Sequence, residues 1–239
     1  DLTAPEQARS LSHSHIIAGS IATRPTATPA AMVLGTNQTA TNPATVFGPE
    51  IAFAWAREDS GAAREIILKT AAGGTYLCPS SVGAPVTASN TWAVGEDLPT
   101  SLLHMARTDM WGAIQSLANS GVGLNIRCLL WMQGESDAYG VATAANYQAS
   151  LQSLFGTGKI DSGAGSMRAV IGRIRNADPL MDATASASVR SAQSGFVAAN
   201  GSAAALVDTD SFSLMADSLH YNGAGQKALG AALYAAAGL

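Results

Sequence analysis

Runs of consecutive apolar residues alternate along the chain with segments in which apolar residues recur every three or four positions. The consecutive runs predict buried strands and occur in "HIIAGS", "REIILKTAA", "LNIRCLLWM", "MRAVIGRI" and "AALVDTD". The spaced segments predict helices and occur in "PEIAFAWARED", "SLLHMARTDMWGAIQSLANSG", "AANYQASLQSLFG", "ASASVRSAQSGFVAAN" and "NGAGQKALGAALYAAAGL". Alternation of this kind is typical of βαβ units. We therefore expect an α/β protein with three layers, α/β/α, around a mainly parallel central sheet.

The length and the spacing of these segments favour one domain over residues 1–239. No internal repeat is visible, and no linker divides the chain after residue 48. Residues 1–46 are atypical, because Pro- and Thr-rich stretches such as "ATRPTATPAA" predict extended loops. A truncated or processed start is one interpretation of this segment.

Charge and composition exclude several classes of partner. The net charge is -4, and the 13 Lys and Arg residues form no basic run, so we expect no nucleic-acid binding. No apolar stretch reaches the roughly 18 residues that a membrane span needs, and no signal-peptide pattern begins the chain. The low charge density of the surface is typical of secreted or virion-exposed proteins. We expect an extracellular or virion-associated protein.

The two cysteines, Cys78 and Cys128, form no disulfide framework. Cys128 lies inside an apolar run, which predicts a small buried side chain, and Cys78 lies in a predicted loop. A disulfide between Cys78 and Cys128 is one possibility that the sequence allows.

Polar or glycine-rich residues follow three of the predicted strands, at the ends where parallel α/β sheets bind ligands. Gly73 and Gly74 follow the second strand and either stop it or let a backbone N–H approach a substrate oxygen. Gln133 follows the third strand, where its amide either caps a turn or donates to an oxyanion. After the last strand, Asp217 and His220 have the spacing of a histidine base that a carboxylate orients. Such a spacing also occurs in ordinary surface turns.

Five motifs stand in the order found in one family of esterases: "KTAAGGT", "LLWMQGESDA", "VRSAQ", "VDTD" and "DSLHYNGAGQ". Over residues 32–239 the chain resembles SGNH-type hydrolases, and more narrowly their carbohydrate acetylesterase and sialate O-acetylesterase-like branch. The resemblance implies a flavodoxin-like fold and ester hydrolysis through a serine nucleophile. It implies an acetylated carbohydrate as substrate and no metal or organic cofactor.

The same resemblance implies roles for individual residues. His220 is the general base and Asp217 orients it, while Gly74 and Gln133 are similar to the oxyanion-hole donors. Glu135 matches a glutamate that holds the site through hydrogen bonds.

The family's first block, a strand followed by Gly-Gln-Ser, is not intact in this chain. Ser20 follows the strand in "HIIAGS", whereas Ser10 lies in "ARSLS" without a strand before it. The third alternative places the block upstream of Asp1.

Three other functions compete with the esterase. An SGNH-like module that has lost its nucleophile would bind carbohydrate or serve a structural role. A metal-dependent hydrolase could use Glu135, Asp137, Asp208, Asp210 and His220. A retaining glycosidase would need Glu135 and Asp137 to face each other at about 5 Å. The sequence does not name the sugar, the acyl group or the oligomeric state.

Overall fold

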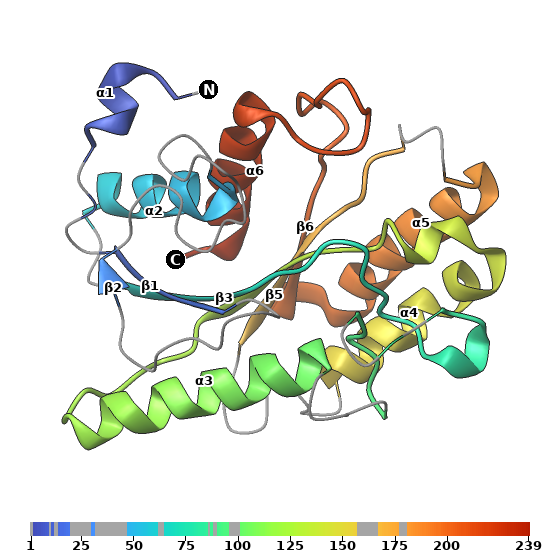
Figure 1. Ribbon diagram of the computed structural model, residues 1–239, viewed down its shortest axis with the longest axis horizontal. Coiled ribbons are helices and arrows are strands. Elements are labelled where there is room, and N and C mark those ends of the chain that lie inside the picture. Colours follow the sequence, from blue (N-terminus) through green and yellow to red (C-terminus); the bar gives the residue numbers. More distant parts are fainter. Residues whose placement is uncertain are drawn as a thin grey trace. The chain divides into compact units, whose positions relative to one another are not determined.

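The structure is a computed structural model, and its described residues form two compact units that interleave along the chain (Figure 1). The first unit comprises residues 1–71, 109–123 and 211–239, and the second comprises 72–108 and 124–210. Helices combine with parallel strands in both, which confirms the predicted α/β class. The expected single domain over residues 1–239 stays a prediction. The described residues are 2–9, 11, 14–19, 30–31, 47–61, 65–85, 87, 90–95, 101–156, 167–176 and 181–239.

The first unit contains a three-stranded sheet with the order β2-β1-β3. Strand β1 (Ser14–Gly19) is parallel to β3 (Glu65–Thr70), and their carboxyl ends meet where Gly19 pairs with Thr70. The short β2 (Ala30–Ala31) pairs antiparallel with β1. The strand predicted in "HIIAGS" is therefore confirmed.

Two helices of the first unit, α2 (Pro49–Asp59) and α6 (Gly223–Ala237), pack against each other. Pro49 occupies the first turn of α2, where its missing N–H costs no helical hydrogen bond. The apolar side of α2 forms a core with the sheet, which includes Ile16, Ile51, Trp55 and Ile67. The two helices approach closely because Gly230 has no side chain: a Cβ there would lie 2.1 Å from the carbonyl oxygen of Pro49.

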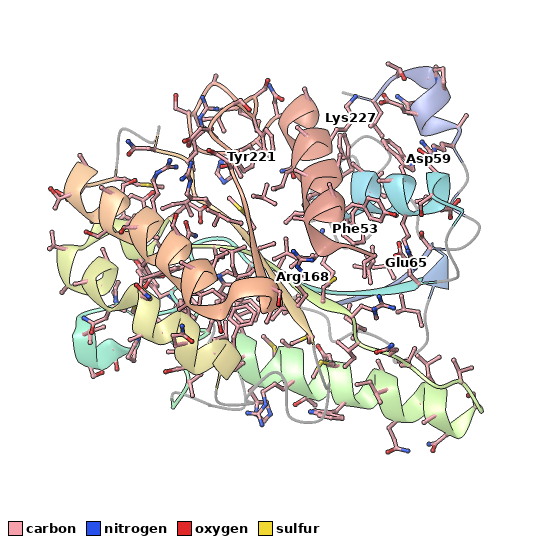
Figure 2. The ribbon with its side chains drawn as sticks, turned by 180° about the vertical axis from the view of Figure 1, so that it is seen from behind. Phe53, Asp59, Glu65, Arg168, Tyr221 and Lys227 are labelled. Carbon is pink, nitrogen blue, oxygen red and sulfur yellow. The ribbon has the colours of Figure 1, made fainter. Side chains whose placement is uncertain are left out.

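A four-residue helix near the start of the chain, α1 (Ala4–Gln7), was not predicted, because its sequence shows no helical periodicity. Contacts from far along the chain hold it. The Lys227 ammonium of α6 binds the Glu6 carboxylate at 3.0 Å, and Arg9 binds Asp59 and lies over the ring of Trp55. Figure 2 shows Lys227 on α6 and Asp59 at the end of α2.

The second unit contains a fully parallel sheet with the order β4-β5-β6. Its strands are β4 (Cys128–Met132), β5 (Arg168–Gly172) and β6 (Ala204–Val207). The central strand β5 is the most buried of the three. This burial explains why its sequence is a continuous apolar run instead of an alternating one.

Helices α4 (Val141–Gly156) and α5 (Ala183–Asn200) pack together in the second unit, and α5 also contacts β6. The core is partly aromatic: Trp131 makes edge-to-face contacts with Trp92 and Phe155, at centroid distances of 5.3 and 6.3 Å. Helix α3 (Leu102–Asn119) begins in the second unit and ends in the first. The 3-10 turns are η1 (Ser80–Val82), η2 (Asp137–Tyr139) and η3 (Gly201–Ala203). In the described part of the chain, no helix is both long and apolar enough to cross a membrane.

Neither Cys78 nor Cys128 forms a disulfide among the described residues. Cys78 is fully buried and donates to the carbonyl of Thr143 at 3.1 Å. Burial raises the pKa of the Cys78 thiol to about 12. Cys128, predicted to be buried, is half-buried in β4.

We expect Gly230→Ala to lower the free energy of unfolding by about 1–3 kcal/mol, because its new methyl group would force α2 and α6 apart. Gly112→Ala on α3 is the matched control, since a Cβ at that position meets no atom within 4 Å. The control should stabilise the protein by about 0.5–1 kcal/mol through helix propensity. Urea unfolding measures both, and equal stability of the two variants would contradict the close packing of α2 and α6.

Candidate active site

Asp217 and His220 form a hydrogen-bonded pair in the first unit. Asp217 Oδ2 lies 2.8 Å from His220 Nδ1, while Asp217 Oδ1 accepts the backbone N–H groups of Leu219 and His220, each at 3.0 Å. These hydrogen bonds, that of His220 first, lower the pKa of Asp217 to about 2. With Nδ1 facing a carboxylate, the imidazole carries its proton there and offers Nε2 as the proton acceptor. The pair therefore has the geometry of a general base and its orienting acid.

A hairpin over residues 211–222 carries this pair between β6 and α6. Leu214 and Tyr221 face each other in an antiparallel bridge, and the Ser213 carbonyl accepts the N–H of Asn222 at 3.1 Å. The hairpin gives the loop a fixed backbone on both sides of the pair.

The turn of this hairpin is tight. The N–H of Met215 donates to the His220 carbonyl at 2.7 Å, and the N–H of Ser218 donates to the Met215 carbonyl at 3.1 Å. Ser218 has a φ of 60°, a left-handed conformation that is uncommon outside glycine. This turn places the Asp217 carboxylate beside the N–H groups that follow it.

The start of α6 fixes the hairpin. Asn222 caps the helix by accepting the N–H of Gly225 at 3.0 Å, and its Nδ2 donates to the Leu214 carbonyl at 3.0 Å. A Cβ on Gly225 would lie 2.1 Å from the carbonyl oxygen of Ser213, so only glycine allows this approach. Figure 2 shows Tyr221 on the segment that enters α6.

Gln133 follows β4 in the second unit and is almost completely buried. Its Nε2 donates to the carbonyl of Thr75 at 2.7 Å and to Asp137 Oδ2 at 2.8 Å. The hydroxyl of Tyr147 lies 2.6 Å from the Gln133 carbonyl and 3.0 Å from Gln133 Oε1. Both amide hydrogens of Gln133 are therefore engaged within the protein.

Asp137 is the centre of this network. Its side chain is fully buried, and its carboxylate also accepts the N–H groups of Leu77 at 2.9 Å and Cys78 at 3.0 Å. Burial raises the pKa of Asp137 even though these N–H groups and Gln133 lower it. The carboxylate thus ties the loop after β3 to the turn after β4.

Two glycines of the predicted motifs differ in their surroundings. Gly74 has a φ of +68°, and a Cβ built there would meet no atom within 4 Å, so its backbone is open to approach. Gly134 has a φ of +146°, and its Cβ would lie 2.9 Å from Ile174 and 3.0 Å from Val189. Gly134 is therefore needed for packing. Glu135, between this glycine and η2, is half-buried.

Some of the predicted site residues lie outside the part of the chain that the structure describes. Ser10 and Ser20 lie outside the described residues, so the nucleophile stays a prediction. The Asp217–His220 pair belongs to the first unit, whereas Gly74 and Gln133 belong to the second.

Three residues of the network were not singled out from the sequence: Thr75, Tyr147 and Gln193. Gln193 is fully buried on α5, accepts the N–H of Ile174 at 3.0 Å and donates to the Gln133 carbonyl at 3.1 Å. The only signal for it was its place in "VRSAQ", one of the five motifs.

Asp208 and Asp210, considered above as metal ligands, are paired with arginines. Arg190 binds both carboxylate oxygens of Asp210, at 2.8 and 2.7 Å, and Arg173 binds Asp208 and Asp210. Among the described residues, no group of three or more His, Cys, Asp or Glu side chains is arranged to hold a metal ion.

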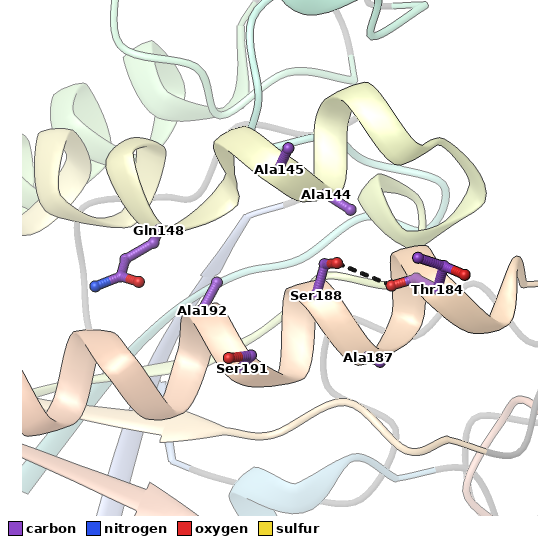
Figure 3. Close-up of a pocket in the computed structure, with 8 residues that line it drawn as sticks. All are labelled: Ala144, Ala145, Gln148, Thr184, Ala187, Ser188, Ser191 and Ala192. Atoms are coloured by element: carbon purple, nitrogen blue, oxygen red, sulfur yellow. Dashed lines mark hydrogen bonds between the residues drawn. The ribbon is translucent and has the colours of Figure 1, made fainter.

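A surface groove of about 480 Å³ runs between α4 and α5 (Figure 3). Small and hydroxyl-bearing side chains line it, together with Gln148. The Ser188 hydroxyl is turned back to the carbonyl of Thr184 at 2.9 Å. None of the predicted catalytic residues lines the groove.

Comparison with known proteins identifies the class. Residues 21–238 match the family model described as carbohydrate esterase, sialic acid-specific acetylesterase, and the chain belongs to this family. The X-ray structure of a protein from Arabidopsis thaliana is similar, with a TM-score of 0.66 and 21% identity over 99% of this chain and 84% of that chain. At this identity the likeness shows the fold alone. No curated protein matches the chain.

We expect Asp137→Asn to lower the free energy of unfolding by about 2–4 kcal/mol, because the new NH2 group would face N–H donors that now meet an oxygen. Asp208→Asn is the matched control, since the Asp208 side chain is 61% exposed and its ion pair with Arg173 is near the surface. The control should cost less than about 1 kcal/mol. Chemical denaturation followed by tryptophan fluorescence compares the two, and similar losses would show that the Asp137 network adds little.

Proposed function

We propose that the protein is a serine esterase that removes O-acetyl groups from a carbohydrate through an acyl-enzyme. The observation that carries this proposal is the 2.8 Å contact between Asp217 and His220, at the position where the family motif has its acid and base. Membership of a carbohydrate esterase family supports the reaction class.

His220 and Asp217 supply the proton chemistry. His220 Nε2 takes the proton of the serine hydroxyl as Oγ bonds to the acetyl carbonyl carbon. The Asp217 carboxylate stabilises the imidazolium that forms, and its low pKa keeps it charged while it does so. The imidazolium then protonates the departing sugar oxygen as the ester bond breaks. Water, activated in the same way, hydrolyses the acetyl-serine to acetate and free serine.

Ser20 is the proposed nucleophile, with Ser10 as the alternative. The last residue of β1 is Gly19, at the carboxyl end of a parallel strand pair, and Ser20 is the next residue in the sequence. Ligands of α/β proteins bind at such strand ends. Ser10 instead follows α1, shortly after Arg9, whose guanidinium binds the side of α2.

Gly74 and Gln133 are proposed to stabilise the oxyanion. Gly74 has no side chain that could stand between its N–H and a substrate oxygen, and no other atom fills the place of a Cβ. Gln133 can donate to a substrate oxygen only by exchanging one of its present acceptors, Thr75 O or Asp137 Oδ2. Catalytic hydrogen bonds often form only when the substrate binds, so this exchange is compatible with the role. Glu135 is proposed to support the same turn.

We expect His220→Ala to lower kcat/KM for acetyl esters by about 10²–10⁴-fold, because the serine then has no general base. Release of p-nitrophenol from p-nitrophenyl acetate measures this loss. His104→Ala, which removes an imidazole from α3, is the control and should stay within about threefold of the wild type.

Labelling with a fluorophosphonate, followed by peptide mapping, completes the test. The proposal expects the label on Ser20 in the wild type. A label on Ser10 would move the nucleophile there. Absence of any label, together with equal rates of the wild type and His220→Ala, would leave a carbohydrate-binding module as the function.

Asp217→Asn should lower kcat by roughly 10²–10⁴-fold at every pH from about 4 to about 9. An asparagine oxygen can still accept the N–H groups of Leu219 and His220, so the turn survives while the charge is lost. Because the pKa of Asp217 is lowered to about 2, the carboxylate stays charged over this whole pH range, and its protonation cannot change wild-type activity there. A pH profile of kcat checks both points. An unchanged kcat in the variant would contradict the orienting role.

A further inference from the structure

Met215 and His220 are opposite each other in the hairpin over residues 211–222. The bridge between Leu214 and Tyr221 sets the register, so the next pair along the two arms is Met215 and His220. The 2.7 Å hydrogen bond from the Met215 N–H to the His220 carbonyl confirms this pairing. Side chains that face each other across antiparallel arms point to the same side, with Cβ atoms about 4.5–5.5 Å apart.

The burial of residues along the hairpin shows that the side chains of Met215 and His220 point to its outer side. Phe212, Leu214 and Tyr221 are half-buried and lie on the inner side, where the rings of Phe212 and Tyr221 are in contact. Met215 is 54% exposed, and the side chain of His220 is 69% exposed. The outer side of the hairpin therefore presents a thioether next to the imidazole.

We propose that Met215 is a specificity-determining residue that contacts the apolar part of a bound ester beside His220. The inference rests on the proposed function. Asp217 holds Nδ1, so an ester attacked with the help of His220 must lie at Nε2, on the exposed side of the ring. A methionine side chain is long and flexible enough to reach a group there, and it offers only apolar and polarizable surface.

The position of Met215 also argues against a role in folding. Its backbone closes the hairpin, but the residue is mostly exposed and belongs to neither of the two buried hydrophobic clusters. Its neighbours at the turn, Ala216, Asp217 and Ser218, are small or polar. Replacing the side chain should therefore change substrate preference and leave stability nearly unaffected.

The apolar part of an ester is either its acyl chain or its alcohol, and two ratios distinguish them. The acyl ratio is kcat/KM for p-nitrophenyl butyrate divided by kcat/KM for p-nitrophenyl acetate. The alcohol ratio is kcat/KM for p-nitrophenyl acetate divided by kcat/KM for methyl acetate. Each variant is compared with the wild type on the same ester, which cancels differences in leaving-group reactivity.

The variants are Met215→Ala, Met215→Leu and the control Val122→Ala. Val122 is an apolar residue of the first unit that is 44% exposed. Met215→Ala should lower one of the two ratios by about three- to tenfold, because contact with the larger group is lost. Met215→Leu, which keeps apolar surface, should restore that ratio to within about twofold of the wild type.

The outcomes separate this inference from the proposed function. A lower acyl ratio places Met215 against the acyl chain, and a lower alcohol ratio places it against the alcohol. If both ratios in Met215→Ala match those of Val122→Ala while the wild type is active, Met215 makes no substrate contact and the esterase proposal stands. If the wild type is no faster than His220→Ala on any ester, the esterase proposal is wrong and the role of Met215 with it.

Discussion

The buried carboxylate of Asp137 is the interaction on which the loops of the second unit depend. It accepts N–H groups from Leu77 and Cys78 after β3 and from Gln133 after β4, so a single side chain sets the spacing of two loops. Burying a charge is unfavourable unless hydrogen bonds compensate for the lost water, and these bonds supply part of that compensation. The raised pKa of Asp137 shows that desolvation still outweighs them.

Asp217 shows how the same chemistry has the opposite result at the surface. It also accepts two backbone N–H groups and one side-chain nitrogen, yet its pKa falls to about 2. The difference is solvent: Asp217 is exposed, so desolvation opposes its hydrogen bonds only weakly and they outweigh it. One carboxylate therefore serves as a structural tie between loops, and the other is available to remain charged beside a base.

The sequence predicted the elements and the local pairing well. Continuous apolar runs identified β1 and β3 to β6, and three-to-four spacing identified the helices from α2 onward, because both periods follow directly from backbone geometry. The D-x-x-H spacing predicted that the side chains of Asp217 and His220 could meet, since residues three apart lie within one turn of the chain. The catalytic roles of the two residues stay predictions.

The sequence could not show which residues donate hydrogen bonds to the oxygens of Gln133. Tyr147 lies 14 residues away and Gln193 lies 60 residues away, and no local rule connects residues at such distances. Helix α1 was missed because four residues are too few to show a helical period. Its local signals are the capping box of Thr3 and Glu6 and a proline in the first turn, and the contact of Glu6 with Lys227 adds to them. The damaged Gly-Gln-Ser block left the nucleophile open, and the described residues do not include either serine.

The contact between Glu6 and Lys227 joins residues 221 positions apart, and it constrains the order of events during synthesis. The first unit needs α6, which is synthesised after the other described helices. Until then the part of α2 that packs on α6 lacks its partner and is exposed to other chains. The second unit contains no residue beyond 210, so the ribosome has made all of it before α6 is available to the first unit.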